Sequence, residues 1–302
     1  MEEEGNGVNA SGQTDLAVGF VGLGNQGAPI ARRIVDAGFS TTLWARRPSA
    51  LEPFAGAGAK VAGSLVELGA SSEVVGVCVL DDAAVEEVVA GPGGVLEGMR
   101  AGGIVMVHST VHPETCVRLG EVASSRGITV VDAPVSGGRL VAEAGRLLVM
   151  VGGDEPAVAR VRPVLATFGN PVLHLGMLGA GQRAKLLNNL TLTANLAVAE
   201  GAFALAAQLD VDPDMFAQVL AHGSGNSTGA KMLRPESGYS LAAMRDTAGP
   251  LLCKDARLAA ELAAAAGADA LSVFAAADTA LESMGYPRSK RPRGHAEPDL
   301  TI

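Results

Sequence analysis

The segment from residue 22 to residue 27 constrains the fold more than any other part of this sequence. It has the pattern G-x-G-x-x-G, and its residues are Gly22, Leu23, Gly24, Asn25, Gln26 and Gly27. The apolar run 16–21 is typical of a buried strand, and residues 28–37 are typical of a helix that stops at Gly38. In that setting the glycines permit a tight turn, the approach of a pyrophosphate and the packing of helix on strand. The segment predicts a dinucleotide-binding loop, with a structural glycine turn as the alternative.

The rest of the first half alternates between short apolar runs and helical patterns. Runs rich in Val, Ile and Leu predict strands at 41–44, 74–79, 104–107, 128–131, 147–151 and 172–174. Helical spacing predicts helices at 83–89, 113–125 and 155–168. Continuous apolar strands that alternate with helices indicate a parallel sheet covered on both faces. We therefore expect an α/β Rossmann-type doubly wound parallel sheet.

The pattern changes at residue 179, after which Ala and Leu repeat at helical spacing without a convincing strand. Residues 186–209 predict one long helix that joins this half to the first. We expect a disordered leader at 1–15, an NADP-binding Rossmann domain at 16–178, an all-α domain at 179–286 and a disordered tail at 287–302.

Composition excludes several classes of protein. A formal net charge of −9 over 302 residues argues against an extended nucleic-acid surface. The acidic N-terminus is unlike a secretory signal, and we expect no apolar run that approaches the roughly 18 residues needed to span a bilayer. Three widely spaced cysteines form no disulfide or metal pattern. We expect a cytoplasmic protein that binds neither nucleic acid nor membrane.

The residues after the second expected strand bear on the choice of cofactor. NAD-binding loops commonly place a carboxylate there to hold the ribose 2′-hydroxyl. This chain has Ala45, Arg46 and Arg47 instead. Two guanidinium groups without a carboxylate attract a 2′-phosphate, which predicts NADP(H) in preference to NAD(H). Solvated surface arginines are the alternative.

Two further segments carry candidate site residues. Ser136 is followed by Gly137 and Gly138, which leaves backbone N–H groups uncovered and able to bind a carboxylate, although a plain turn would look the same. Lys185 lies in an apolar, amide-rich helical stretch of a chain with few lysines, and Asn189 projects from the same helix face four residues later. A solvated helix lysine is the alternative for Lys185.

Four motifs, taken in order, resemble the β-hydroxyacid dehydrogenase family, which includes 3-hydroxyisobutyrate dehydrogenases and glyoxylate and succinic semialdehyde reductases. They are the glycine loop, the run D-A-P-V-S-G-G at 132–138, the segment 179–189 and the pair Lys254-Asp255. The resemblance covers nearly the whole chain, from about residue 17 to residue 286.

The resemblance implies a role for each matching residue. Lys185 would be the catalytic general acid and base, while Ser136, Gly137, Gly138 and Asn189 would bind substrate. The cofactor would contact the glycine loop and the residues Ala45, Arg46, Arg47, Leu80, Ser109, Thr110 and Lys254. The implied activity is hydride transfer between the nicotinamide and a small β-hydroxyacid or its aldehyde acid. An imine reductase-like NADPH enzyme and a non-catalytic nucleotide-binding partner protein remain alternatives.

Several positions depart from the family pattern. Val107 stands where an aspartate is common, His108 follows it, and Arg146 replaces a usual threonine. We expect His108 and Arg146 at the surface rather than facing the cleft. The spacing of His108 and His112 could suggest a metal site, but no carboxylate or cysteine set accompanies them. We therefore expect no bound metal. The Ala-rich helical half predicts a homodimer or homotetramer.

Overall fold

The computed structural model describes residues 16–288, and the chain divides into two compact units. The expected leader at 1–15 and residues 289–302 of the expected tail lie outside the described residues. The N-terminal unit ends at Lys185 and the C-terminal unit begins at Leu186. The division falls inside one continuous helix, α8 (Ala180–Gln208), which contributes its first residues to one unit and the remainder to the other.

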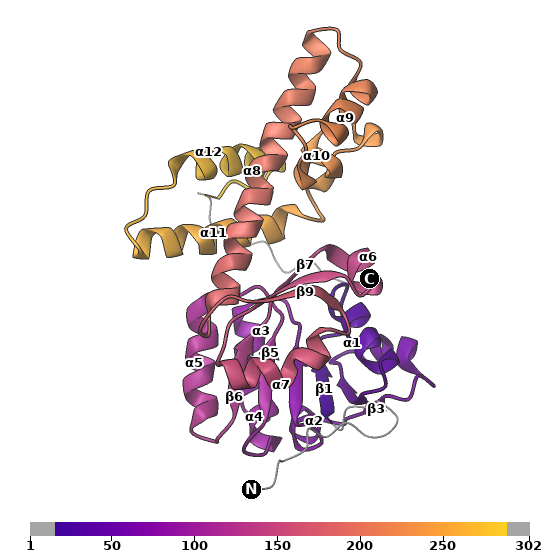
Figure 1. The fold of residues 1–302 in the computed structure, drawn as a ribbon, viewed down its shortest axis with the longest axis vertical. Coiled ribbons are helices and arrows are strands. Elements are labelled where there is room, and N and C mark those ends of the chain that lie inside the picture. The colour runs from indigo at the N-terminus through magenta and orange to yellow at the C-terminus, as the bar shows by residue number, and fades with distance from the viewer. Residues whose placement is uncertain (1–15, 289–302) are drawn as a thin grey trace, which may run out of the picture. The chain divides into compact units, whose positions relative to one another are not determined.

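A six-stranded parallel sheet with the order β3-β2-β1-β4-β5-β6 forms the centre of the N-terminal unit (Figure 1). The strands are β1 (Ala17–Val21), β2 (Ser40–Trp44), β3 (Lys60–Val61), β4 (Val74–Val77), β5 (Ile104–Val107) and β6 (Thr129–Asp132). This is the strand order of a doubly wound dinucleotide-binding fold. It confirms the predicted fold class.

Helices connect these strands. They are α1 (Gly27–Asp36), η1 (Pro48–Phe54), α2 (Leu65–Ala70), α3 (Asp82–Ala90), α4 (Val95–Gly98) and α5 (Pro113–Ser124). Side chains cap the N-termini of three of them, α2, α3 and α5. The Ser64 hydroxyl caps α2 by accepting from the Glu67 N–H, and the Asp81 carboxylate caps α3 by accepting from the Ala84 N–H. Helix α1 has no side-chain cap, and its N-terminus is the glycine loop itself.

The last two predicted strands do not extend this sheet. They form a separate three-stranded sheet, in which β8 (Leu147–Val151) pairs antiparallel with β7 (Val135–Ser136) and parallel with β9 (Gly169–His174). A single antiparallel bridge between Asp132 and Gly152 connects the ends of the two sheets. Pro134, which has no N–H to donate, lies between β6 and β7. Helices α6 (Gly138–Glu143) and α7 (Glu155–Leu165) belong to this part of the unit.

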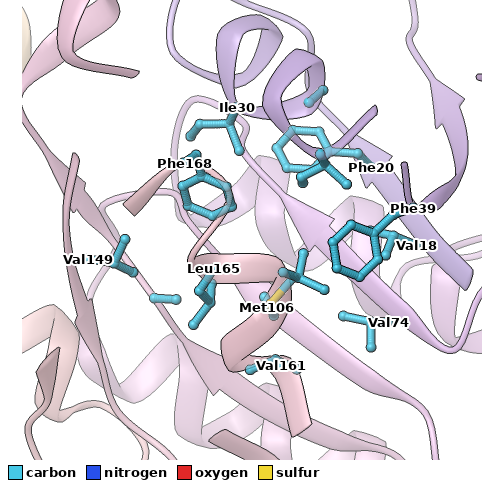
Figure 2. Packing of buried hydrophobic residues seen from close by; sticks show 14 of the residues in the cluster. Val18, Phe20, Ile30, Phe39, Val74, Met106, Val149, Val161, Leu165 and Phe168 are labelled. Atoms are coloured by element: carbon cyan, nitrogen blue, oxygen red, sulfur yellow. The ribbon is translucent and has the colours of Figure 1, made fainter. Parts of the chain in front are cut away.

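Alternate residues of the central strands build a core on each face of the sheet. Ile104 and Met106 of β5 point into one cluster, while Val105 and Val107 point into the other. The first cluster includes residues of α1 and α7, and Figure 2 shows Phe20, Ile30 and Phe168 within it. The second includes residues of α2, α3, α4 and α5. Helices therefore cover both faces, as a buried parallel sheet requires.

The C-terminal unit contains helices joined by loops, and no strand among its described residues. Beyond α8 it contains α9 (Pro213–His222), α10 (Thr228–Met232), η2 (Pro235–Ser237), η3 (Leu241–Met244), α11 (Gly249–Ala265) and α12 (Leu271–Ser283). Its core joins α8, through Leu186, Leu190 and Leu196, to buried residues of α11 and α12.

Among the described helices, α8 alone is long and apolar enough, by length and composition, to cross a membrane. The expectation of no apolar run of this length is therefore wrong for α8, whose apolar residues are interrupted by polar ones in the sequence. Those polar residues include Gln182, Lys185, Asn189 and Thr193, all of which are buried. Buried polar groups of this kind, together with the leucines that fill the C-terminal core, are what a core helix of a globular protein presents.

Candidate active site

A cavity of about 490 Å³ lies at the carboxyl ends of β1, β2 and β4. The strand order turns at β1 and β4, where open α/β sheets bind their ligands. Its lining contains the whole glycine loop (Gly22, Leu23, Gly24, Asn25, Gln26, Gly27) and the predicted Ala45, Arg46, Arg47 and Leu80. The structure thus gathers these predicted cofactor residues around one cavity.

The glycines of the loop have different structural reasons to lack a side chain. Gly22 has a φ of +93°, and a Cβ there would lie 2.1 Å from the Cys78 carbonyl oxygen. At Gly27 a Cβ would lie 1.9 Å from the Gly22 carbonyl oxygen, so only glycine lets α1 approach the loop. A Cβ at Gly24 would meet no atom within 4 Å. Two glycines are therefore needed to form the loop, and the third leaves room for a phosphate to approach its backbone.

The end of β2 gives the cavity its positive charge. Arg46 and Arg47 are both exposed and line it, and Trp44, the only tryptophan of the chain, lies beside them. The lining includes one carboxylate, that of Glu87, and it comes from α3 rather than from the end of β2. The charge pattern fits a nucleotide phosphate near the arginines.

Ser109 and Thr110 follow β5 and do not line this cavity. The Ser109 hydroxyl accepts a hydrogen bond of 2.8 Å from the Val79 N–H, which ties the end of β5 to the end of β4. The Gln182 side chain donates to the Ser109 carbonyl oxygen at 2.8 Å and accepts from the Val111 N–H at 3.2 Å. Gln182 is fully buried, so the first turn of α8 is fixed against the loop after β5.

Asp132, at the end of β6, also binds the N-terminus of α8. Its carboxylate accepts from the Gly179 N–H at 2.6 Å and from the Gln182 N–H at 2.7 Å, which caps the N-terminus of α8. Burial raises the pKa of the Asp132 carboxyl from 3.8 to about 6, although both N–H groups act to lower it. Lys185 follows on α8 and is only 8% exposed, so it is not a solvated surface lysine.

The predicted carboxylate loop lies at the edge of the second sheet. Ser136 ends β7, and α6 begins at Gly138. Gly137 and Gly138 have φ values of +137° and +74°, a conformation that L side chains rarely adopt, and both are exposed. Only at Gly138 is the space for a side chain open, because a Cβ at Gly137 would lie 2.7 Å from Val141.

In the C-terminal unit, Asn189 and Lys254 meet at Asp255. The Asn189 amide donates to one Asp255 carboxylate oxygen at 2.6 Å, and the Lys254 ammonium lies 2.9 Å from the other. Asp255 is 4% exposed and sits on α11. The Asn189 side-chain oxygen in turn accepts from the Asn188 amide at 3.1 Å, so both polar ends of this side chain have partners within the protein.

The expectation that His108 lies at the surface is wrong. Its ring is 2% exposed, stacks on Phe20 at 5.9 Å between centroids and meets the edge of Phe168 at 5.5 Å. Its Nδ1 donates to the Ala133 carbonyl oxygen at 2.9 Å, and burial lowers the pKa of His108 to about 4. Arg146 is exposed, as expected.

His112 has a local structural role at the start of α5. Its Nδ1 accepts from the Glu114 N–H at 3.2 Å, which caps the helix. Among residues 16–288, no group of three His, Cys, Asp or Glu side chains is placed to hold a metal ion.

Sequence reasoning missed several residues that shape these sites. Gln182 and Asp132 were seen only as parts of motifs, and Trp44, Leu65 and Glu87 were not identified as lining the cavity. The unusual tryptophan at the end of the second strand was the one available signal. Nothing in the helical pattern of 83–89 distinguishes Glu87 from its neighbour Glu86.

Comparison with known proteins identifies both halves of the chain. Residues 17–176 match the NAD binding domain of 6-phosphogluconate dehydrogenase. Residues 179–291 match the family described as NAD-binding of NADP-dependent 3-hydroxyisobutyrate dehydrogenase.

Individual relatives are similar in sequence to most of the chain. The 3-hydroxyisobutyrate dehydrogenase of Pseudomonas aeruginosa is 35% identical over 74% of this chain and 75% of its own length. The NAD-dependent L-serine dehydrogenase of the same organism is 31% identical over 94% of this chain and 95% of its own. The solved structure of Mycobacterium tuberculosis 3-hydroxyisobutyrate dehydrogenase with L-serine has a TM-score of 0.76 at 30% identity, covering 91% of this chain and 96% of its own.

Proposed function

The chain belongs to the β-hydroxyacid dehydrogenase family, an NAD(P)-binding family of oxidoreductases, and from this premise we propose its specific reaction. The protein transfers a hydride between NADP(H) and a small β-hydroxyacid or its aldehyde acid, with Lys185 as the proton donor and acceptor. One observation carries the proposal. Gln182 and Asp132 fix the start of α8 against the ends of β5 and β6, and Lys185 lies buried one turn later.

The position of Lys185 follows from this anchoring. Residues three apart on a helix share a face, so Lys185 and Gln182 project toward the same side of α8. Gln182 contacts Ser109 and Val111, which flank Thr110 in the loop after β5. Lys185 is thereby held on the side of α8 that faces this loop. The large cavity takes the nucleotide at the ends of β1, β2 and β4, which leaves the loop after β5 for the nicotinamide.

The chemistry requires a proton at the substrate oxygen. When bound, the cofactor supplies or accepts the hydride at the substrate carbon. In the reducing direction Lys185 gives a proton to the former carbonyl oxygen, and in the oxidising direction it takes the hydroxyl proton. Its burial excludes water, which makes the interaction of the ammonium with a developing alkoxide stronger than in solvent.

A small acid is the substrate class that the remaining residues support. The exposed, positive-φ backbone of Gly137 and Gly138 is suited to a carboxylate, and Ser136 precedes it in the chain. Binding the carboxylate at a fixed point would orient the reacting carbon. Two of the relatives are named for 3-hydroxyisobutyrate and L-serine, both of which are 3-hydroxy acids.

The preference for NADP(H) rests on the end of β2. Arg46 and Arg47 are exposed at the cavity and no carboxylate accompanies them there. A 2′-phosphate would bind two guanidinium groups, whereas a ribose 2′-hydroxyl would lack the acidic partner that NAD enzymes supply. We expect kcat/KM to be higher for NADPH than for NADH. A clear preference for NADH, as the name of the L-serine relative describes for that protein, would refute this part of the proposal.

The proposal is tested by turnover of short aldehyde acids with NADPH and of the matching hydroxyacids with NADP⁺. Lys185→Ala should lower kcat by a factor on the order of 10²–10⁴. The affinity for NADPH, measured from the fluorescence of Trp44, should change little. Lys231→Ala, which removes an exposed lysine of α10, is the matched control and should retain full activity. Unchanged turnover in Lys185→Ala would remove Lys185 as the proton donor, and turnover of cyclic imines alone would indicate the imine reductase alternative.

A further inference from the structure

The large cavity is built for one half of a dinucleotide. Its lining comes from β1, β2, β4, the segments that follow them and the helices α1, η1, α2 and α3, and no described residue beyond Val88 contributes. The end of β2 binds the adenosine ribose in this fold, and the glycine loop binds the pyrophosphate. The part of the cavity beyond the arginines is therefore left for the adenine base.

The wall formed by α2 and α3 suits a flat base, with one exception. Leu65, Ala84 and Val88 give it apolar surface, and Trp44 adds an aromatic ring. Glu87 is the exception, since it lines the same wall with a carboxylate.

The Glu87 carboxylate has no hydrogen-bond or ion-pair partner within residues 16–288, whereas the adjacent Glu86 pairs with Arg118. Glu86 does not line the cavity. The two neighbours thus differ in partner and in position, and only Glu87 is available to a ligand in the cavity.

An ionised carboxylate only accepts hydrogen bonds, so its partner must be a donor. Adenosine offers donors at the ribose hydroxyls and at the 6-amino group of adenine. The ribose hydroxyls would bind at the end of β2, where Arg46 and Arg47 lie. Glu87 lies on α3 among the apolar lining residues, which leaves the 6-amino group as its donor. We propose that Glu87 accepts a hydrogen bond from the 6-amino group and so selects adenine over 6-oxo purines. The proposal rests on the proposed function, because it requires the cofactor to occupy this cavity.

The test compares binding of NADP⁺ with binding of its hypoxanthine analogue, in which an oxo group replaces the 6-amino group. Dissociation constants come from the fluorescence of Trp44, which lines the cavity, and from calorimetry, so no turnover is needed. The wild-type protein should bind NADP⁺ about 3- to 10-fold more tightly than the analogue, as expected for one partly exposed hydrogen bond. Because both ligands carry the same phosphates, their ratio cancels the general effect of removing a negative charge.

Two variants of Glu87 and one control sharpen the comparison. Glu87→Ala should reduce the ratio to about one. Glu87→Gln, whose amide can accept from adenine and donate to hypoxanthine, should also lower the ratio, but by improving binding of the analogue. Glu86→Ala removes the neighbouring carboxylate, which pairs with Arg118, and should keep the wild-type ratio.

Each outcome decides a different question. A ratio that stays at the wild-type value in Glu87→Ala overturns the assignment of Glu87, and so does a wild-type ratio of one. A variant that changes the preference between NADP⁺ and NAD⁺ while leaving the base ratio intact would show that Glu87 acts on the ribose or its phosphate, which also overturns the proposal. If the wild-type protein binds neither NADP⁺ nor NAD⁺, the proposed function fails instead.

Discussion

The buried imidazole of His108 should make the N-terminal unit sensitive to acid. Burial lowers the pKa of His108 from 6.5 to about 4, so between these values the unfolded chain takes up a proton that the folded chain does not. The free energy of unfolding must therefore fall as the pH decreases from 6.5 to 4. A difference of about 2.5 pH units, at about 1.4 kcal/mol per unit, corresponds to about 3–4 kcal/mol. About 3 kcal/mol of this is lost by pH 4, where the folded-state imidazole is half protonated.

Asp132 acts in the opposite direction over nearly the same range. Its folded-state pKa is raised from 3.8 to about 6, so the folded chain holds this proton to higher pH than the unfolded chain. The resulting stabilisation is present at low pH and is lost as the pH rises from about 4 to 6. A simple pH profile of the wild-type protein would therefore hide much of the effect of His108.

The substitution His108→Asn separates the two effects. The asparagine amide would keep a donor for the Ala133 carbonyl oxygen without a titrating ring, while Asp132 stays in both proteins. Loss of ring packing between Phe20 and Phe168 should destabilise the variant at pH 7. The stability of the wild-type protein relative to His108→Asn should then fall by about 3 kcal/mol between pH 7 and pH 4.

Urea unfolding followed through Trp44 measures this difference, because the only tryptophan lies in the N-terminal unit. The free energies of unfolding of the two proteins are compared at several values from pH 7 to pH 4. A constant difference across that range would refute the reasoning, because it would mean that His108 titrates alike in the folded and unfolded chains. An imidazole NMR signal of His108 that titrates near pH 6.5 would refute it as well.

Three other changes have defined outcomes. Gly27→Ala should lower both the melting temperature and the affinity for NADPH, because its Cβ would lie 1.9 Å from the Gly22 carbonyl oxygen. Gly24→Ala should lower the affinity for NADPH alone, because a Cβ at Gly24 meets no atom within 4 Å. Gln182→Leu leaves the Ser109 carbonyl and the Val111 N–H without this partner and should destabilise the N-terminal unit by about 2–5 kcal/mol in urea unfolding; no loss of stability would contradict the anchoring of α8. Replacing Arg46 and Arg47 together with serine should raise KM for NADPH at least about tenfold and change KM for NADH little, and an equal rise for both cofactors would argue against recognition of the 2′-phosphate.

Local sequence patterns were sufficient for five of the six strands of the central sheet. Ile104–Val107 is a continuous apolar run because both of its faces are buried, and such runs identify central strands of parallel sheets. Strands of two residues produce no such pattern. Lys60–Val61 is exposed and Val135–Ser136 follows a proline, so β3 and β7 were not predicted, nor was the second sheet that β7 completes.

The site was predictable only where a motif has a local cause. The glycine loop is one example, because Gly22 and Gly27 are required by contacts within the loop or with the neighbouring strand. His108 shows the limit. Its surroundings are Phe20 and Phe168, which are distant in sequence and adjacent only in the fold. The bonds of Gln182 to Ser109 and Val111 likewise join segments about seventy residues apart, and no periodicity reveals them.

The large cavity draws on no described residue after Val88, whereas Ser109, Asp132, Ser136 and Lys185 all come later in the chain. Under the proposed roles, the residues for coenzyme choice and those for substrate chemistry occupy consecutive stretches of the polypeptide. Grafting the first stretch from a relative with the other coenzyme should transplant its preference while leaving the reacting groups untouched, a modularity open to both evolution and engineering.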